Sequence, residues 1–152
     1  MKIIIVGTAY PYRGGLAAYN ERLAREYIAQ GHDVEIYTFK LQYPAFLFPG
    51  KTQLSEEPAP TDIVCKRAIH SISPFNWLKV GAELRRKKAD KIIFCYWMAF
   101  MAPCFGTIAR IARKSGAKCI ALVHNMIPHE PTILDKLFPK CFVNAMDGFV
   151  TM

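Results

Sequence analysis

The sequence predicts an α/β protein: a three-layer, Rossmann-like domain with a mostly parallel sheet of about six strands and helices on both faces. Short apolar runs alternate with longer segments of helical periodicity along the chain. The first run, Lys2–Val6, is apolar at successive positions, which is typical of a strand buried on both faces of a parallel sheet. With 152 residues, of which 52% are hydrophobic and 21% charged, the composition suits one folded domain.

The remaining elements are expected in a regular order. Gly31 is predicted to end the first helix, and Pro74 to lie in the first turn of the second. The expected strands are residues 2–6, 34–39, 63–69, 91–96, 118–123 and 148–152, and the expected helices are 16–30, 74–88, 102–114 and 132–145. The core-facing stripe of the first helix is predicted to be Leu16, Tyr19, Leu23, Ala24, Tyr27 and Ile28.

Two segments depart from the alternation. Residues 40–62 form a long, proline-rich loop that also carries aromatic side chains, and loops of this length are usually functional or disordered. Residues 92–109 contain no charge and reach the length of a membrane-span candidate. Pro103, Gly106 and the ready division into strand, loop and helix argue against a span.

The cysteines and the N-terminus indicate a reducing, cytoplasmic protein. The five cysteines form no C-x-x-C pair and show no metal-ligand spacing, so no metal site is expected. Cys65, Cys95 and Cys119 fall in strand-like runs and are expected to be buried free thiols. The apolar run after Met1 is too short for a secretory signal.

The net charge of +8 comes largely from two clusters, residues 84–91 and 110–114. These clusters suit solvated helix ends, where cations are favoured by the helix dipole. They also suit contact with an anionic membrane surface. No nucleic-acid-binding signature accompanies the charge, so a nucleic-acid partner is not expected.

Three predicted loops follow strands at the carboxyl edge of the sheet, where ligands bind in such folds: residues 7–15, 96–100 and 124–131. In the first, Gly14 and Gly15 precede a helix, whose N-terminus binds anions such as phosphate. Ala9 and Tyr12 stand where a dinucleotide fingerprint would need glycine, and no P-loop lysine follows. A plain tight turn remains the alternative.

The third loop is rich in polar groups. Pro128 precludes a regular helix joining His124 to His129, which disfavours a zinc site, and no nucleophile-elbow pattern exists for a catalytic triad. The loop is therefore expected to offer hydrogen bonds to a sugar or phosphate, although local capping by His124 and an exposed turn at 129–130 stay open. In the second loop Trp97 could stack on a sugar or belong to the core.

The chain resembles the N-terminal half of a family-4 glycosyltransferase with the two-domain B-type fold. The resembling pieces are Pro11-x-x-Gly14-Gly15 before a helix, Leu23-Ala24 through Gly31-His32-Asp33-Val34, the pair His124-Asn125, and Asp147-Gly148-Phe149-Val150. The resemblance implies that residues 1–152 form the acceptor-side domain and that a C-terminal domain, absent from this chain, binds the donor. The isolated domain is then expected to have little or no activity.

The resemblance also implies roles for individual residues. Gly14 and Gly15 would contact the donor diphosphate, and His124 would contact the transferred sugar as the catalytic residue. The expected acceptor contacts are Tyr10, Arg13, Trp97, Asn125, His129 and Glu130. The family typically transfers sugars with retention of configuration and without a bound metal, so the only co-substrate implied is a nucleotide-sugar.

The basic clusters and the 40–62 loop suit an acceptor at a membrane, such as a lipid-linked glycan in cell-envelope polysaccharide synthesis. The protein is therefore expected in the cytoplasm, peripheral on the inner face of the membrane. Two other classes remain open. One is a non-catalytic interaction module. The other is a Rossmann-type cofactor binder, disfavoured because Thr38-Phe39-Lys40, with no acidic residue, closes the second strand.

Overall fold

The computed structural model describes residues 1–12, 14–42, 54–124 and 139–151. The strands are β1 (Lys2–Val6), β2 (Asp33–Leu41), β3 (Val64–His70), β4 (Lys91–Tyr96), β5 (Lys118–Val123) and β6 (Gly148–Thr151). The helices are α1 (Gly15–Ala29), α2 (Pro74–Lys87) and α3 (Ala102–Ala112), with the short 3-10 helices η1 (Ala99–Met101) and η2 (Arg113–Ser115). Residues 139–143 are also helical.

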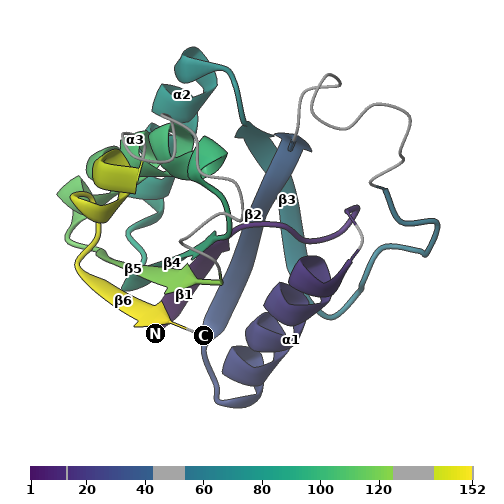
Figure 1. Ribbon diagram of the computed structural model, residues 1–152. Coiled ribbons are helices and arrows are strands. Elements are labelled where there is room, and N and C mark those ends of the chain that lie inside the picture. The colour runs from purple at the N-terminus through teal and green to yellow at the C-terminus, as the bar shows by residue number, and fades with distance from the viewer. Residues whose placement is uncertain (13, 43–53, 125–138, 152) are drawn as a thin grey trace.

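The six strands form one parallel sheet in the order β3-β2-β1-β4-β5-β6, which confirms the predicted fold class. β1 is central: Ile5 pairs with Ile36 of β2 on one side and Ile93 of β4 on the other. Helices cover both faces, with α2 and α3 together on one face and α1 on the other (Figure 1). Because all strands run the same way, the loops after β1, β4 and β5 emerge at one edge, as predicted.

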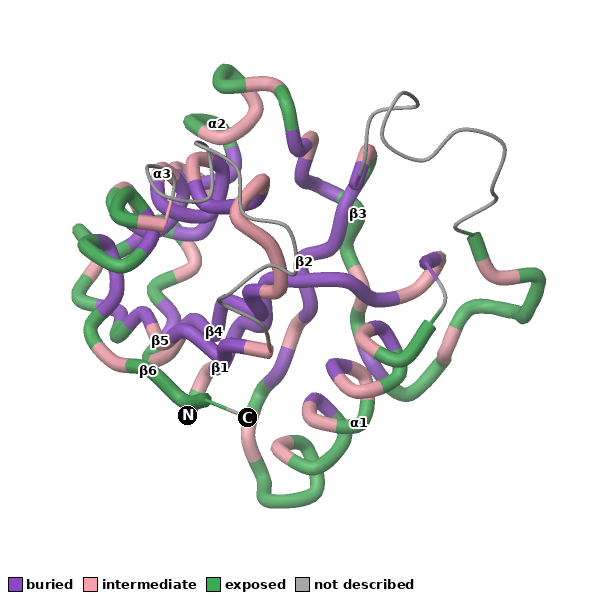
Figure 2. The backbone as a smooth tube through the Cα atoms, viewed as in Figure 1, coloured by how far each residue is buried: buried purple, intermediate pink, exposed green. Residues whose placement is uncertain are grey.

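Successive residues of β1 enter two different cores, as expected for a strand buried on both faces. Ile4 and Val6 pack on the α2–α3 side with Phe105, while Ile3 and Ile5 pack on the α1 side. Figure 2 shows the buried backbone concentrated in β1, β4 and β5 and along the inner side of α3. The central strands therefore form a rigid base for the loops at their carboxyl ends.

The core-facing stripe of α1 agrees with the prediction in part: Ala24 is buried and Tyr19, Leu23 and Tyr27 pack against the same core. Ala17 and Asn20 are buried as well, whereas Ile28 is 38% exposed. The reason is the close approach of α1 to the sheet. A Cβ added at Gly7 would lie 2.8 Å from Cys95 Cβ and 3.0 Å from Asn20 Nδ2. Small side chains therefore face the sheet, and the larger ones flank the contact.

Element boundaries differ modestly from the sequence prediction. β2 continues to Leu41, and the expected helix 102–114 is divided between α3 and η2. The expected helix 132–145 is described only from residue 139 onward, where residues 139–143 are helical. Within loop 40–62, residues 43–53, which include its aromatic cluster, lie outside the described residues.

The cysteines are free, as predicted, but their burial follows a different pattern. Cys95 and Cys119 are buried, and burial raises the pKa of each thiol to about 12. Cys65 is only partly buried because it lies on the edge strand β3, whereas Cys104 in α3 is buried. Across the residues that the structure describes, no helix is long and apolar enough to span a membrane. Residues 92–109 are divided among β4, η1 and α3 instead.

Candidate active site

The loop after β1 is held in place by one side chain of α1, one of β2 and that of Gln42, which follows β2. Thr8 Oγ1 donates a hydrogen bond to Gln42 Oε1 at 2.8 Å, and Asn20 Nδ2 of α1 donates to the carbonyl oxygen of Thr8 at 2.8 Å. The backbone N–H of Ala9 donates to Thr38 Oγ1 of β2 at 3.1 Å. These bonds are buried, so breaking one leaves an unsatisfied polar group. The loop is therefore fixed before any ligand arrives.

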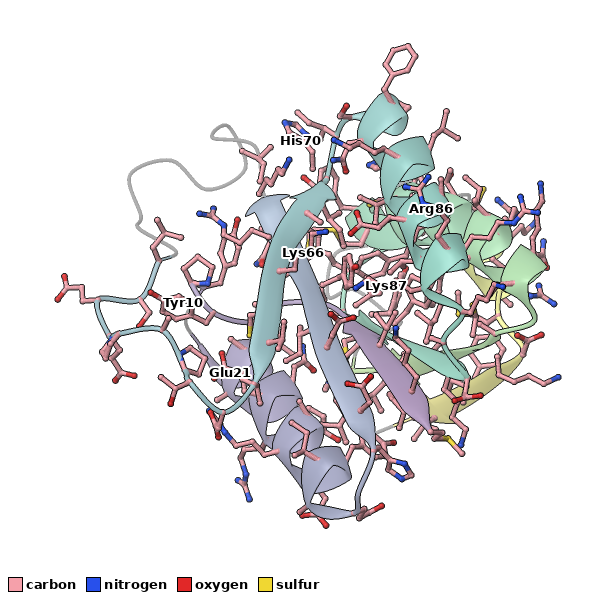
Figure 3. All side chains as sticks on the ribbon, turned by 180° about the vertical axis from the view of Figure 1, so that it is seen from behind. Tyr10, Glu21, Lys66, His70, Arg86 and Lys87 are labelled. Atoms are coloured by element: carbon pink, nitrogen blue, oxygen red, sulfur yellow. The ribbon has the colours of Figure 1, made fainter. Side chains whose placement is uncertain are left out.

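Tyr10 and Tyr12 extend this anchoring. The Tyr10 N–H donates to Glu21 Oε1 at 2.8 Å, and the two side chains lie on the same side of the domain in Figure 3. Tyr12 is buried and packs edge-on against Phe39, with ring centroids 6.4 Å apart. The carbonyl oxygen of Pro11 accepts a hydrogen bond from the Ser55 N–H at 2.6 Å. The loop thus also connects to the segment after residue 53.

Gly14 and Gly15 play different structural roles. Gly14 is the N-cap of α1 and has a φ of 119°, a backbone conformation that favours glycine. Gly15 is the first residue of α1, and a Cβ added there would meet no atom within 4 Å. Among the described residues, no side chain caps this N-terminus, and the first turn carries no acidic residue. Its N–H groups are therefore available to an anion.

His124 lies directly after β5 and contacts α1. Its N–H donates to the Tyr96 carbonyl oxygen at 2.9 Å, and its ring meets the Tyr19 ring edge-on with centroids 5.0 Å apart. The Nε2 atom is buried and has no hydrogen-bond partner among the described residues. Burial lowers the pKa of His124, so the imidazole is neutral near pH 7. A neutral ring can donate through one nitrogen and accept through the other.

Trp97 occupies a different environment from His124. Its ring is half-buried and lies 6.0 Å from the Phe39 ring and 6.3 Å from the Phe105 ring, on the α2–α3 side of the sheet. Its neighbour Tyr96 is fully buried and stacks on Phe142 with centroids 4.4 Å apart. The structure therefore gives Trp97 a packing role, and the predicted acceptor contact stays a prediction.

The predicted site is thus brought together in part. Tyr19, one helical turn after Gly15, contacts His124, and the Tyr10 N–H is bound to the same helix through Glu21. The other predicted acceptor residues, Arg13, Asn125, His129 and Glu130, lie outside the described residues. The described part of the chain contains no group of three or more His, Cys, Asp or Glu side chains that could hold a metal ion.

Two clefts flank α1 and share its N-terminal end. One, of about 650 Å³, lies between α1 and residues 55–60 and is lined by Tyr10, Gly14, Glu21 and Arg25, among others. The second, of about 510 Å³, follows the opposite flank of α1 along Gly15, Tyr19, Arg22 and Leu23. The first offers an aromatic ring, carboxylates and a cation, the kinds of group that bind sugar hydroxyls. A ligand at the helix N-terminus would border both clefts.

Sequence reasoning missed three neighbouring residues of α1: Tyr19, Asn20 and Glu21. Asn20 had a recognisable signal, because a polar residue between Ala17 and Ala24 at helical spacing indicates a buried hydrogen bond. Tyr19 was assigned to the core, although its ring also contacts His124. Glu21 had no signal in the sequence, since its partner is a backbone N–H in a loop.

Comparison with known proteins gives a family and a fold. The sequence model of the family described as "Glycosyltransferase Family 4" matches residues 13–150. Comparison with curated protein sequences gives no match. An α-glucosyltransferase solved with UDP and a 13-mer DNA containing an HMU base is similar in structure, with a TM-score of 0.60 and 13% identity, over 98% of this chain and 37% of that one.

Two further α-glucosyltransferase structures are also similar. One, with UDP and a 13-mer DNA containing a central A:G mismatch, has a TM-score of 0.60 and 12% identity, over 99% of this chain and 37% of that one. The other, in complex with UDP, has a TM-score of 0.57 and 12% identity, over 99% of this chain and 35% of that one. At such identities the likeness concerns the fold, and the chain spans little more than a third of these proteins' length.

Proposed function

The chain belongs to glycosyltransferase family 4, and we propose that it is the N-terminal, acceptor-side domain of an enzyme that transfers a sugar from a nucleotide-sugar to a glycan or lipid-linked glycan. The donor would be held mainly by a second domain across the cleft. This domain would supply one wall of the site, formed by the N-terminus of α1 and by His124.

One observation carries the proposal: Tyr19, one turn after the uncapped N-terminus of α1, contacts the His124 ring at the carboxyl edge of the sheet. As the bond between the sugar and the diphosphate breaks, negative charge develops on the leaving phosphate. The N–H groups after Gly14 and the helix dipole would stabilise that charge. The buried hydrogen bonds of residues 8–12 support this role, because a fixed donor costs no reorganisation during the reaction.

We propose that transfer retains configuration. The bond from the anomeric carbon to the diphosphate oxygen would break as a bond to the acceptor hydroxyl forms on the same face. The acceptor proton would go to the leaving phosphate, so no general base from this domain would be required. Neutral His124 would hydrogen-bond the transferred sugar. Neither a metal nor a bound cofactor is required in this scheme.

The acceptor would lie toward the cleft between α1 and residues 55–60. Tyr10 supports this placement because it lines that cleft beside Glu21, and carboxylates accept hydrogen bonds from sugar hydroxyls. Arg13, Asn125, His129 and Glu130 are proposed as further acceptor contacts. Trp97 could contribute only through the exposed part of its ring. We place the enzyme in the cytoplasm, at the inner face of the membrane, in the synthesis of cell-envelope polysaccharide.

Titration of the isotopically labelled chain with UDP, ADP and GDP, followed by NMR, tests the proposed anion site. We expect weak binding, because the other wall of the cleft belongs to a second domain. The largest shifts should fall on the amides of Gly15, Leu16 and Ala17 and on the His124 ring. Shifts elsewhere only, or none at millimolar nucleotide, would contradict the proposal.

Turnover gives an independent test of the two-domain arrangement. We expect the 152-residue chain alone to show no measurable transfer from any nucleotide-sugar, because half of the cleft would be missing. A protein that joins this chain to a donor-binding domain should transfer sugar. Measurable turnover by the isolated chain would contradict the proposed division of roles.

A further inference from the structure

The outward side of α2 carries an apolar patch that contributes nothing to the core. Phe75 is 86% exposed and Leu78 51% exposed, and Ile72, which precedes the helix, is 47% exposed. Phe75 and Leu78 lie three residues apart at the start of α2, and Ile72 lies two residues before the helix begins. Single exposed apolar residues are ordinary, but an adjoining group of large ones marks an interaction site. We call Ile72, Phe75 and Leu78 the apolar ridge.

The fold does not require the apolar ridge, because α2 is fixed by its other side. Val80, Gly81 and Leu84 are buried against the neighbouring elements. At Gly81 the helices approach so closely that an added Cβ would lie 2.9 Å from Ile111 Cβ of α3. The inner side therefore accounts for the packing of α2, and the ridge is free to serve another purpose.

The same outward side carries cations. At 3.6 residues per turn, Phe75, Leu78, Lys79, Arg85 and Arg86 share an arc of about 120°. All five are exposed. Arg86 and Lys87 are labelled on α2 in Figure 3. The one acidic residue of α2 is Glu83, which bonds to Lys66 and to the Tyr37 hydroxyl. Glu83 lies one turn after Lys79, but its carboxylate pairs with Lys66, and among the described residues Lys79, Arg85 and Arg86 form no ion pair.

The second basic cluster, residues 110–114, behaves differently. Arg110 donates to the Cys141 carbonyl oxygen at 2.9 Å, and Arg113 forms an ion pair with Asp147 at 2.8 Å. Both arginines therefore tie α3 to the segment before β6. In the cluster at residues 84–91, Lys87 forms an ion pair with Glu35 at 3.2 Å, but Arg85 and Arg86 form none among the described residues and lie beside exposed apolar side chains.

We propose that α2 docks on a membrane surface rich in anionic lipids. The apolar ridge would enter the boundary between headgroups and acyl chains, and Lys79, Arg85 and Arg86 would contact lipid phosphates. Charge complementarity favours this partner, because the chain as a whole carries +8. Nucleic acid would attract the same cations but would give Phe75, Leu78 and Ile72 no apolar environment.

The topology gives this docking a consequence for the site. α2 begins after β3 and α1 begins after β1, so both N-termini lie at the carboxyl edge of the sheet. A membrane contacted by the apolar ridge would bring that edge close to a lipid-linked acceptor. The placement of the enzyme at the membrane belongs to the proposed function, so this inference rests on it; what it adds is the surface of α2 that makes the contact.

Co-sedimentation with vesicles at low ionic strength tests the proposal. Vesicles of equal parts phosphatidylcholine and phosphatidylglycerol should bind the chain, and pure phosphatidylcholine should bind it far less. In the double variant Phe75→Ser, Leu78→Ser the partition coefficient onto these vesicles should fall at least about tenfold, because two apolar side chains that would be buried in the membrane are lost. The double variant Arg85→Gln, Arg86→Gln should lose about fivefold for each charge, and added salt should abolish this difference.

Matched variants separate the patch from general surface properties. Val64→Ser with Phe149→Ser removes two similarly exposed apolar residues from the edge strands, and Lys114→Gln with Lys118→Gln removes two charges elsewhere. Both control variants should bind anionic vesicles within about twofold of the parent chain. Circular dichroism and melting temperature establish that every variant is folded.

Three results would overturn the proposal. The parent chain could fail to bind anionic vesicles, the ridge variant could bind as well as the controls, or duplex DNA could bind with the same dependence on Arg85 and Arg86 and none on Phe75. Vesicle binding requires no sugar transfer, and nucleotide titration requires no membrane. Failure of this inference and failure of the proposed function are therefore distinguished by separate measurements.

Discussion

α1 and α2 begin at the same edge of the sheet, yet their N-termini are completed in opposite ways. The N-terminus of α2 is satisfied internally: Ser73 Oγ accepts from the Asn76 N–H at 3.4 Å, and Pro74 supplies a first-turn residue without an N–H. α1 begins at Gly14 and Gly15, and no side chain of a described residue caps it. An anion thus has more unsatisfied N–H groups to bind at α1 than at α2, where Ser73 and Pro74 account for two of the first positions.

The same contrast extends to the loops before the two helices. Asn76 and Trp77 of α2 fold back onto β3 and its end: Asn76 Oδ1 accepts from the His70 N–H at 2.8 Å, and Trp77 Nε1 donates to the His70 carbonyl oxygen at 2.8 Å. On α1, Asn20 and Glu21 instead hydrogen-bond to the backbone of the preceding loop, and they leave the helix N-terminus uncapped. Polar side chains therefore cap the N-terminus of α2, whereas those of α1 bind the preceding loop and leave the helix N-terminus uncapped.

Gly15→Val should give the largest effect. In a protein that carries both domains we expect transfer to fall about 100-fold, because a branched side chain at the first helical residue would displace the diphosphate from its N–H donors. The melting temperature of the 152-residue chain should change by less than about 2 °C, because the space around Gly15 is open. Initial rates and thermal melts provide the two measurements.

Ala29→Val is the matched control at the exposed far end of α1, and it should leave both quantities unchanged. A loss of stability in Gly15→Val that accounts for its loss of transfer would favour the plain-turn interpretation of Gly14-Gly15. In that case the contrast between the two helix ends would concern folding alone.

Ser73→Ala should have the opposite profile. Removing an N-cap side chain costs about 1 kcal/mol of folding free energy. We therefore expect a lower urea midpoint, with nucleotide binding at α1 unchanged. Ser115→Ala, at the end of η2, is a comparison because its hydroxyl donates to the Ala112 carbonyl oxygen and caps no N-terminus. Loss of nucleotide binding in Ser73→Ala would show that the two helix ends are not independent.

The sequence predicted the fold and the general position of the site because both depend on periodicity and strand order. The apolar runs at β1, β4 and β5 coincide with the strands, and parallel strands place their following loops at one edge. Contacts between elements could not be predicted in this way. Whether Trp97 faces a ligand or Phe39 depends on packing across β2, β4 and α3, and the Tyr19–His124 contact depends on the distance between α1 and the sheet.

The outward side of α2 illustrates the same limit. The sequence shows two basic clusters, residues 84–91 and 110–114, but it does not show which of them takes part in contacts within the fold. Only the contacts of Arg110 and Arg113 show that the second cluster serves the fold. Phe75 and Leu78 resemble core residues in the sequence. They are exposed because α2 packs against α3 through its opposite side, at Gly81.

The smallest expected effect is a pH dependence from His124. Burial lowers its pKa in the folded state, so the unfolded chain binds the proton more readily. The contribution of His124 to the free energy of unfolding should therefore decrease as the pH falls below the ordinary histidine range, and stay level above it. In His124→Gln this decrease should be smaller than in the parent chain. Urea titrations at several pH values measure the difference, and identical pH profiles for His124→Gln and the parent would show that the imidazole is not held neutral beside Tyr19.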